Sequence, residues 1–237
     1  MNALLLAAGL GTRLRPLTDT IPKCLAPIRG MPLLDYWLDL LLNQGIDRIL
    51  INTHYMADTV RNHIASSKWR GRIDLAHEDV LLGTGGTILH NRAFFQSQPL
   101  LVAHSDNLTR FDVQAFLKRH AMRPDGVEIT MMTFETDAPE SCGIVEEDER
   151  GIVIGFHEKV NNPPGNHANA AVYILEPTVV DFLANLNKPI IDLSTEVIPH
   201  FLGRICTFPN AGYHRDIGTL ESLRKAESEF EGIATTR

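Results

Sequence analysis

In the first half of this chain, strand-like runs alternate with segments whose apolar residues repeat at helical spacing. Strand-like runs occupy residues 3–8, 48–52, 72–77 and 100–106. The first is apolar throughout, and the last is a buried strand that ends in polar residues. Between the first two runs, apolar residues repeat at helical spacing from Leu33 to Leu42, and Gly45 is a suitable helix stop. A second helix is expected over 56–64. Strands that alternate with helices predict a mostly parallel sheet with helices on its faces.

The second half of the chain is divided into shorter segments. Strand-like stretches at 127–134, 144–145, 152–156 and 170–175 are separated by clusters of Asp, Gly, Asn and Pro. Residues 161–167 form the clearest loop, and a final helix is expected from Thr219 to about Glu229. This pattern predicts a smaller, antiparallel-containing lobe beside the substrate. Because no repeat or linker interrupts the chain, we expect one domain over 1–230 and a tail over 231–237.

Composition and charge narrow the class of protein. The 237 residues are 44% hydrophobic and 22% charged, which is ordinary for a globular enzyme with one large α/β domain. A net charge of −7 argues against a general binder of nucleic acid or anionic membrane, because both need broad positive surfaces. Any polyphosphate ligand must then be held by a local cluster of cations, helped by a divalent metal.

The cysteines indicate a reducing compartment. Cys24, Cys142 and Cys206 are odd in number, widely separated and without a CxxC pair, which is typical of free thiols in a cytoplasmic protein. Cys24 has no evident base partner and is not expected to be a nucleophile. The ten histidines show no zinc-site spacing, although three of them adjoin proposed site residues. No apolar run is long enough to span a bilayer.

Residues 3–23 carry the strongest functional signal. The first apolar run opens into the string GLGTRLRPLT at residues 9–18, and Lys23 follows shortly afterwards. A glycine turn after a strand lets backbone N–H groups approach a phosphate, because glycine has no Cβ in the way. Cations such as Arg13 compensate several phosphate charges at once. The segment therefore predicts a nucleoside-triphosphate site.

Two better-known glycine signatures are excluded by the same residues. The dinucleotide-binding fingerprint needs a third glycine where this chain has Leu14, and the P-loop string is absent from the chain. The string GLGTRLRPLT followed by Pro-Lys instead resembles the signature of the sugar-1-phosphate nucleotidylyltransferases, also called nucleotide-sugar pyrophosphorylases. The resemblance continues to about Ala226. It looks most like the compact form seen in mannose- and heptose-1-phosphate guanylyltransferases.

This resemblance implies a fold and a set of phosphate contacts. The fold would be a Rossmann-like three-layer α/β/α arrangement of the nucleotide-diphospho-sugar transferase type, with a mostly parallel mixed sheet and a small sugar-binding lobe. In the family the signature Arg and Lys contact the phosphates, so Arg13 and Lys23 are the expected catalytic residues. Stabilising the phosphate charge is most of the catalytic work in such a reaction. The other loop residues expected to bind the nucleotide are Ala8, Gly9, Gly11 and Thr12.

Two acidic residues far apart in the sequence are the expected ligands of Mg²⁺. Asp106, in the string HSDN, comes just past an apolar strand, where ligands of open α/β sheets bind. The family usually has Gly-Asp at this point, and this chain has Ser105. Asp216, in HRDIGT, resembles the family's late D-x-G-T segment, whose Asp shares the metal. That the two residues meet is implied by the resemblance alone, and the alternative for each is a local capping role.

A second glycine cluster concerns the nucleobase. The string LLGTGGT occupies residues 81–87, and in relatives this segment lies beside the base. Its residues resemble the corresponding segment of guanylyl- and uridylyltransferases more than that of thymidylyltransferases. The expected nucleotide contacts are Glu78, Gly83, Thr84 and Gly85. The alternative interpretation is a helix start that needs small residues for packing.

The sugar phosphate is expected to bind residues of the second half. The string FHEKV at 156–160 resembles the family's F-x-E-K motif. It offers Glu158 to accept hydrogen bonds from sugar hydroxyls and Lys159 to neutralise the 1-phosphate. Asn169 resembles the sugar-contacting Asn of N-A-G-x-Y, and Ala171 replaces the glycine of that motif. A larger residue at this position would narrow the sugar pocket.

The sequence thus predicts a cytoplasmic, Mg²⁺-dependent enzyme that transfers a nucleotidyl group from a nucleoside triphosphate, GTP favoured, to a mannose- or heptose-type sugar 1-phosphate. A uridylyltransferase acting on glucose- or muramic-type sugar phosphates is the runner-up. A catalytically silent nucleotide-sugar-binding regulatory protein is disfavoured because the phosphate cations and metal carboxylates are all present. A nicotinamide-dependent oxidoreductase is disfavoured by Leu14. The expected partners are the two substrates, not nucleic acid or membrane, and a homo-oligomer stays open.

Overall fold

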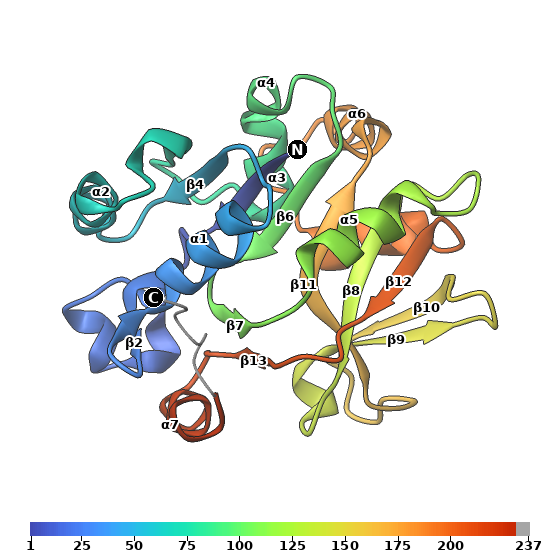
Figure 1. The fold of residues 1–237 in the computed structure, drawn as a ribbon. Coiled ribbons are helices and arrows are strands. Elements are labelled where there is room, and N and C mark those ends of the chain that lie inside the picture. Colours follow the sequence, from blue (N-terminus) through green and yellow to red (C-terminus); the bar gives the residue numbers. More distant parts are fainter. Residues whose placement is uncertain (231–237) are drawn as a thin grey trace.

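A nine-stranded sheet runs through the molecule, a computed structural model that describes residues 1–230 (Figure 1). Its first part is parallel, as the alternating pattern predicted. The first strand, β1 (Asn2–Leu6), lies between β6 (Leu100–His104) and β4 (Ile49–Thr53). Strand β5 (Ile73–His77) pairs with the other side of β4. The tail predicted for 231–237 lies outside the described residues.

The second part of the sheet is mainly antiparallel. It is centred on β11 (His167–Leu175), which pairs with β6 on one side and with β8 (Ile129–Glu135) on the other. The remaining strands are β9 (Gly143–Glu147) and β10 (Val153–Glu158), which are antiparallel, and β12 (Ile205–Pro209), which is parallel to β8. The antiparallel lobe predicted from the sequence is therefore a continuation of the central sheet, and the mixed α/β fold class is confirmed.

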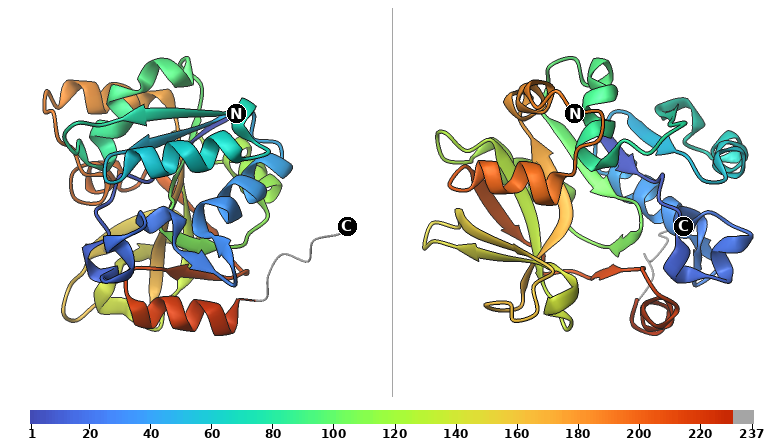
Figure 2. Two further views of the ribbon diagram at one scale, coloured as in Figure 1. Left: turned by 90° about the vertical axis from the view of Figure 1, so that its left-hand side faces the viewer. Right: turned by 180° about the vertical axis from the view of Figure 1, so that it is seen from behind.

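Helices cover both faces of the sheet, which makes three layers (Figure 2). One face packs against α1 (Leu33–Asn43), α2 (Ala57–Ser66) and α5 (Val113–Ala121). The other packs against α3 (Gly83–His90), α4 (Arg92–Phe95) and α6 (Pro177–Asn185). Alternate residues of β1 serve the two layers, because successive side chains of a strand point to opposite faces: Ala3 and Leu5 belong to the first core and Leu4 to the second.

Helix α1 forms where the sequence predicted it, and its amphipathic pattern explains its position. Leu34, Trp37, Leu38 and Leu41 are almost completely buried against the sheet. The chain turns after the helix at Gly45, whose φ of +94° is a conformation that glycine adopts without a steric penalty.

The last described segment of the chain is joined to the sheet by a small two-stranded ribbon. In it, β13 (His214–Asp216) pairs antiparallel with β7 (Asn107–Thr109), the segment that follows β6. Asp216 stands opposite Asn107, and the Ile217 N–H donates to the Asp106 carbonyl at 3.0 Å. The ribbon therefore brings two segments together that are 110 residues apart in sequence.

Helix α7 (Leu220–Glu229) continues from this ribbon and is held by a separate apolar cluster. Thr219 caps its first turn by accepting a hydrogen bond from Ser222 N–H at 3.1 Å. At its other end Phe230, which is 1% exposed, meets the rings of Tyr36 and Tyr213 at centroid distances of 5.3 and 5.2 Å. The cluster also contains Leu14, so it joins α7 to the loop that follows β1.

Replacing Phe230 should therefore weaken the whole fold rather than only the helix end. We expect Phe230→Ala to lower the free energy of unfolding by about 3–5 kcal/mol, the usual cost of removing a buried aromatic ring. Urea denaturation measures this change. Met122→Ala, at a position 69% exposed, is the control and should change stability by less than about 0.5 kcal/mol. A loss below about 1 kcal/mol for Phe230→Ala would show that α7 is not part of the cooperative core.

Candidate active site

The loop after β1 is folded tightly onto the segment that contains Lys23. Gly11 has a φ of +64°, and a Cβ at this position would lie 2.9 Å from Thr18 Cγ2 and 3.1 Å from Lys23 Cβ. Thr18, which is 1% exposed, donates its hydroxyl to the Gly11 carbonyl at 2.7 Å. Glycine is required here both for the backbone conformation and for the close approach. This contact places Lys23 beneath the loop.

Four of the predicted site residues come together at this point. Lys23 Nζ lies 2.6 Å from Asp106 Oδ2 and 3.6 Å from Asp216 Oδ1. Arg13 approaches Asp216 from the loop, with 4.0 Å between its NH2 atom and Oδ2. The Lys23 side chain is only 9% exposed, whereas Arg13 is 69% exposed. Two cations from the start of the chain and two carboxylates from distant segments thus form one cluster.

The two carboxylates differ in how the cluster affects their ionisation. Burial raises the pKa of Asp106, but attraction to Lys23 and His104 and the Lys23 hydrogen bond outweigh it, and the pKa lies below its usual value. Burial and the nearby Asp106 charge raise the pKa of Asp216 above its usual value, and Lys23 and Arg13 only partly compensate. The cluster therefore holds two like charges that Lys23 and Arg13 do not fully balance.

The donor chemistry of this pair fits Mg²⁺. No group of three or more His, Cys, Asp or Glu side chains that could hold a metal occurs among residues 1–230. Mg²⁺, however, keeps several waters and is usually held by one or two carboxylates together with substrate phosphates. Asp106 and Asp216 supply two carboxylates, and their mutual repulsion is relieved by added positive charge.

A cavity of about 590 Å³ extends from this cluster into the antiparallel part of the sheet. Arg13, Asp106 and Asp216 line one end. The residues predicted to bind the sugar phosphate, Glu158, Lys159 and Asn169, line it as well. The structure therefore brings the predicted phosphate, metal and sugar residues to a single space.

Glu158 and Lys159 lie at the end of β10 and form an ion pair, with 2.9 Å between Lys159 Nζ and Glu158 Oε1. Glu158 is 24% exposed and Lys159 is 65% exposed, so the lysine is the freer of the two. Gly143 on the neighbouring strand makes room for Glu158 and Phe156, because a Cβ there would lie 2.7 Å from Glu158 Oε2 and 2.5 Å from the Phe156 ring. This glycine belongs to none of the motifs recognised in the sequence.

Asn169 is positioned by a bulge in β11. The register between β11 and β8 shifts between Asn169 and Tyr173, and Ala171 within the bulge has a φ of +52°. The amide of Asn169 donates to the Tyr173 hydroxyl at 2.6 Å, and its carbonyl accepts from Ala171 N–H at 2.9 Å. One amide hydrogen remains for a ligand. The family motif usually has glycine at position 171, because glycine adopts this left-handed conformation without a steric penalty.

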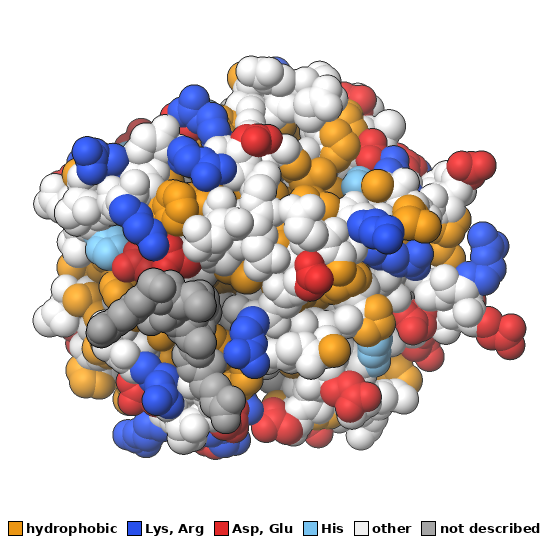
Figure 3. All heavy atoms as spheres, viewed as in Figure 1, with side chains coloured by type: hydrophobic (Ala, Val, Ile, Leu, Met, Phe, Trp, Pro, Cys, Tyr) orange, Lys and Arg blue, Asp and Glu red, His pale blue; other side chains and the backbone are white. Residues whose placement is uncertain are grey.

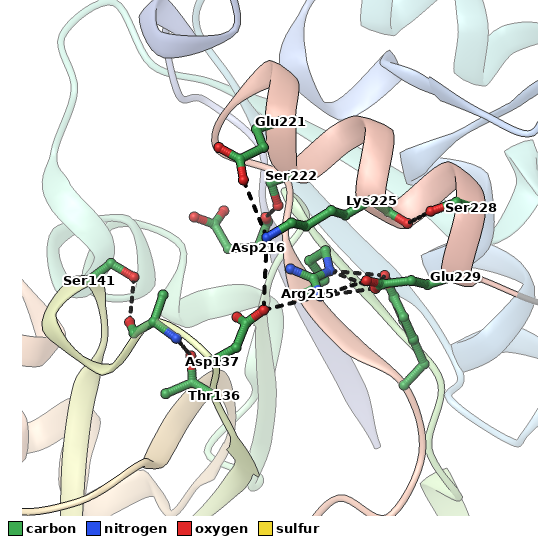
Figure 4. Close-up of polar contacts among 12 residues, drawn as sticks. Thr136, Asp137, Ser141, Arg215, Asp216, Glu221, Ser222, Lys225, Ser228 and Glu229 are labelled. Atoms are coloured by element: carbon green, nitrogen blue, oxygen red, sulfur yellow. Dashed lines mark hydrogen bonds and ion pairs between the residues drawn. The ribbon is translucent and has the colours of Figure 1, made fainter.

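The rest of the cavity wall comes from segments without a recognisable motif. Asp137, in the turn after β8, faces α7 across the cavity (Figure 4). Its Oδ2 atom lies 3.8 Å from Arg215 NH2 and 4.0 Å from Lys225 Nζ. Arg215 also forms a bidentate ion pair with Glu229. The only sequence signal for these residues was the position of Arg215 directly before Asp216.

The second glycine cluster occupies the first turn of α3 and is tightly packed. A Cβ on Gly83 would lie 2.5 Å from the Ile191 carbonyl oxygen, and one on Gly85 would lie 2.8 Å from Ile191 Cγ2. The N–H groups of Gly85 and Gly86 donate to that carbonyl at 2.8 and 3.3 Å. The alternative of a helix start that needs small residues describes this packing, and the predicted contact with a base stays a prediction.

The other predicted nucleotide-binding residues also lie outside the cavity. Glu78 is 4% exposed and accepts hydrogen bonds from Asn52 Nδ2 at 3.0 Å and Thr87 Oγ1 at 2.5 Å, so it joins β4, β5 and α3. Thr84 Oγ1 accepts from Leu193 N–H at 2.7 Å, one residue before Ser194 in the cavity wall. In the first loop, Ala8 is buried, Gly11 half-buried, and Gly9 and Thr12 exposed.

The thiol and imidazole groups near the cluster can now be placed. Burial raises the pKa of Cys24 to about 12, so its thiol stays protonated, as expected for a residue that is not a nucleophile. His104 lines the cavity, with Nδ1 4.0 Å from Asp106 Oδ1, and His157 instead pairs with Glu146 at 2.7 Å. Among the described residues, no helix combines the length and apolar character needed to cross a membrane.

Comparison with known proteins identifies the family. The model of the nucleotidyl transferase family matches residues 2–232, and the chain belongs to this family. A mannose-1-phosphate guanylyltransferase of Mycobacterium tuberculosis is 30% identical over 240 residues, which cover 99% of this chain and 66% of that protein. The chain spans 66% of the length of this relative and 54% of that of a UTP–glucose-1-phosphate uridylyltransferase of Synechocystis, which is 29% identical.

Solved structures share the fold over the whole chain. A Bacillus anthracis protein provisionally assigned as a glucose-1-phosphate thymidylyltransferase, in complex with sucrose, has a TM-score of 0.90 at 22% identity and covers 100% of this chain and 98% of its own. HddC from Yersinia pseudotuberculosis, complexed with GMP-PN, has a TM-score of 0.81 at 26% identity and covers 97% of this chain and 99% of its own. The fold implied by the sequence resemblance is confirmed.

The left-handed backbone of Ala171 leads to a stability prediction. We expect Ala171→Gly to raise the free energy of unfolding by about 0.5–1 kcal/mol, because relief of the strained φ exceeds the entropy gained by the unfolded chain. Thermal and urea denaturation without substrates measures this change. Ala170→Gly, at the neighbouring buried position without a positive φ, is the matched control and should lower stability. Equal losses for both variants would contradict the strain.

The two carboxylates should respond in opposite directions to removal of their charge. At pH 7, without metal or nucleotide, Asp216→Asn should raise the melting temperature, since the raised pKa of Asp216 shows that its charge is unfavourable in the native state. Asp106→Asn should lower it, because the pKa of Asp106 is depressed.

The pH dependence separates the two effects further. The gain from Asp216→Asn is present above the folded pKa and disappears as the pH falls to the ordinary carboxyl value of 3.8. The loss from Asp106→Asn persists at 3.8 and vanishes only as the pH falls through the lower folded pKa of that residue. Melting curves between pH 7 and pH 3 test both statements, and losses of equal size for the two variants would contradict them.

Proposed function

We propose that this member of the nucleotidyl transferase family transfers a nucleotidyl group from a nucleoside triphosphate, with GTP favoured, to a sugar 1-phosphate of the mannose or heptose type. Pyrophosphate is the second product. The observation that carries the proposal is the convergence of Arg13, Lys23, Asp106 and Asp216 at one end of a cavity whose other wall contains Glu158, Lys159 and Asn169.

The proposed reaction is an in-line displacement at phosphorus. An oxygen of the sugar 1-phosphate attacks the α-phosphorus, a new P–O bond forms, and the bond to pyrophosphate breaks with its electron pair on the leaving oxygen. No covalent enzyme intermediate is needed, so the protein contributes positioning and charge stabilisation. Arg13 is exposed and free to move to the triphosphate, and Lys23 holds a fixed positive charge at the floor of the site.

Asp106 and Asp216 are the proposed ligands of Mg²⁺, which offsets triphosphate charge when it is bound. The two side chains are 33% and 52% exposed, so each has a free face toward the cavity. Their backbones are fixed by the β7–β13 pairing, which sets their separation before any ligand arrives. This preorganisation lowers the entropy lost when substrates bind.

The sugar phosphate is proposed to occupy the wall formed by the ends of β10 and β11. Lys159 offers an exposed ammonium to the 1-phosphate once it leaves Glu158, and Glu158 then accepts hydrogen bonds from sugar hydroxyls. The remaining amide hydrogen of Asn169 donates to a further sugar oxygen. A sugar of the wrong configuration leaves one of these groups unpaired, which is the physical basis of selection.

The preference for GTP rests on relatives rather than on a base pocket. A 30% identical relative is a mannose-1-phosphate guanylyltransferase, and HddC was solved with GMP-PN. The sequence of the glycine cluster at 81–87 resembles that of both guanylyl- and uridylyltransferases. An enzyme that forms a UDP-sugar is therefore the alternative. The proposed nucleotide contacts are the loop residues Ala8, Gly9, Gly11 and Thr12 together with Glu78, Gly83, Thr84 and Gly85.

The proposed setting is a cytoplasmic enzyme whose partners are small molecules. Cys24 and Cys206 are buried free thiols and Cys142 is half-buried, which suits a reducing compartment. On the face drawn in Figure 3, basic and acidic side chains are interspersed rather than gathered into one broad positive surface. Nucleic-acid binding needs such a surface. The proposed ligands are therefore small molecules, which the enzyme would convert into a nucleotide sugar and the regulatory protein would bind as a nucleotide sugar.

A pyrophosphate-release assay tests the proposal directly. Four nucleoside triphosphates are crossed with mannose-, heptose-, glucose- and muramic-type 1-phosphates in the presence of Mg²⁺, and GTP with a mannose- or heptose-type sugar should give the highest kcat/KM. Asp106→Asn should lower kcat/KM by about 10²–10³-fold, the usual effect of losing one group that stabilises transition-state charge.

The matched control is Asp125→Asn, an exposed aspartate in the turn after α5, which should leave turnover unchanged. Full turnover by Asp106→Asn would remove Asp106 from the site. No pyrophosphate release with any of the combinations, while nucleotide sugars still bind, would favour the regulatory protein over the enzyme.

A further inference from the structure

A group of unpartnered polar atoms lies behind the proposed active site. Among residues 1–230, three buried side-chain atoms have no hydrogen-bond partner: Thr133 Oγ1, His167 Nε2 and His214 Nδ1. Glu147 Oε2 lies 3.9 Å from His167 Nε2, beyond hydrogen-bond distance. Buried polar groups in proteins are nearly always paired, so three such atoms in one region need an explanation.

All three residues line one cavity of about 490 Å³, distinct from the cavity of the proposed active site. This second cavity lies at the ends of β8, β11 and β12; its walls are residues 133–135, His167 and residues 209–214. Each unpaired atom is covered by its neighbours, so a ligand reaches it only after side chains of the wall rotate while the backbone stays in place. The gain of a missing hydrogen bond favours that rotation.

The wall of the second cavity is fixed by backbone contacts. The Asn210 N–H donates to the Thr133 carbonyl at 2.8 Å, and Asn210 Oδ1 accepts from Gly212 N–H at 2.8 Å. Gly212 lies so close to the preceding chain that a Cβ would stand 2.1 Å from the Arg110 carbonyl oxygen. The turn at 209–213 is therefore a built feature of the fold rather than a loose loop.

The chemistry of the second cavity differs from that of the first. Arg13, Lys159, Arg215 and Lys225 line the first cavity. Among residues 1–230, no Lys or Arg lines the second cavity, and Glu135 is the only acidic residue in its lining. The unpaired groups are a hydroxyl and two imidazoles. Such a lining rejects phosphate and suits neutral hydroxyl groups, with aromatic faces for a sugar ring.

We propose that the second cavity binds a neutral, hydroxyl-rich ligand of carbohydrate chemistry through Thr133, His167 and His214. The two cavities share Phe134, Glu135 and His214, and the Phe134 and His214 rings stand in contact with centroids 4.3 Å apart. The ligand has two sources: the far end of a sugar whose phosphate lies in the first cavity, or a separate neutral sugar. The first source rests on the proposed function, and the second does not.

Free-sugar binding tests the cavity without any catalytic assay. Mannitol and methyl α-mannopyranoside are titrated into the whole protein without nucleotide, with binding followed by ligand-observed NMR and inorganic phosphate as the negative probe. Thr133→Val, which removes the hydroxyl and keeps the shape, should weaken binding about five- to tenfold, the usual effect of one lost hydrogen bond. Thr130→Val is the matched control on the same strand, because its hydroxyl pairs with His120 and Cys206 away from the cavity.

The second arm compares sugar 1-phosphates of different length. If the ligand is the far end of the substrate, Thr133→Val should lower kcat/KM about five- to tenfold for a heptose 1-phosphate and leave a hexose 1-phosphate unchanged. Free sugars then bind weakly or not at all. If the ligand is a separate sugar, Thr133→Val should weaken free-sugar binding and leave both kcat/KM values unchanged. Either pattern supports the cavity.

The proposal is overturned if free sugars do not bind and if Thr133→Val has the same kcat/KM as the native protein for both sugar phosphates. A higher melting temperature of that variant would then show that the hydroxyl is merely an unpaired group in the wall. If no sugar phosphate is turned over with any triphosphate, the proposed function fails. The free-sugar titration still decides the second cavity in that case, so the two failures are distinguishable.

Discussion

The ammonium of Lys23, shared between Asp106 and Asp216, is the interaction on which the rest of the site depends. Its 2.6 and 3.6 Å contacts draw together the loop after β1, the segment after β6 and the ribbon strand β13. A buried lysine is tolerated only when its charge is paired, and these two carboxylates supply the pairing. The positive φ of Gly11 and the β7–β13 register are therefore parts of one device that fixes where charge lies.

This arrangement places function and stability in opposition at one residue. Asp106 gains more from Lys23 than it loses by burial, whereas Asp216 is held beside a like charge with less compensation. A protein selected for stability alone would not keep the second carboxylate. Its presence makes sense where positive charge arrives with a ligand, and the cations that line the adjacent cavity follow the same logic. The lining of the second cavity, which has no Lys or Arg among the described residues, marks the limit of that cationic region.

The sequence allowed the parallel half of the sheet, helix α1 and the four charged residues of the cluster to be predicted, because apolar periodicity and a long specific motif are local signals. Short elements gave no such signal: β7 and β13 have three residues each, too few for a periodic pattern. The packing partner of the glycine cluster, Ile191, is more than 100 residues away, so its contact with Gly85 could not be deduced. Asp137 and Lys225 meet through the fold alone, without any shared motif.

The order in which the chain is made gives the β7–β13 ribbon a further meaning. A ribosome synthesises Lys23 and Asp106 long before Asp216, and β13 completes the ribbon only when the last tenth of the described chain emerges. Until then the third member of the cluster is missing, and part of the wall of the first cavity has not been made. A chain that ends before Asp216 therefore lacks this centre.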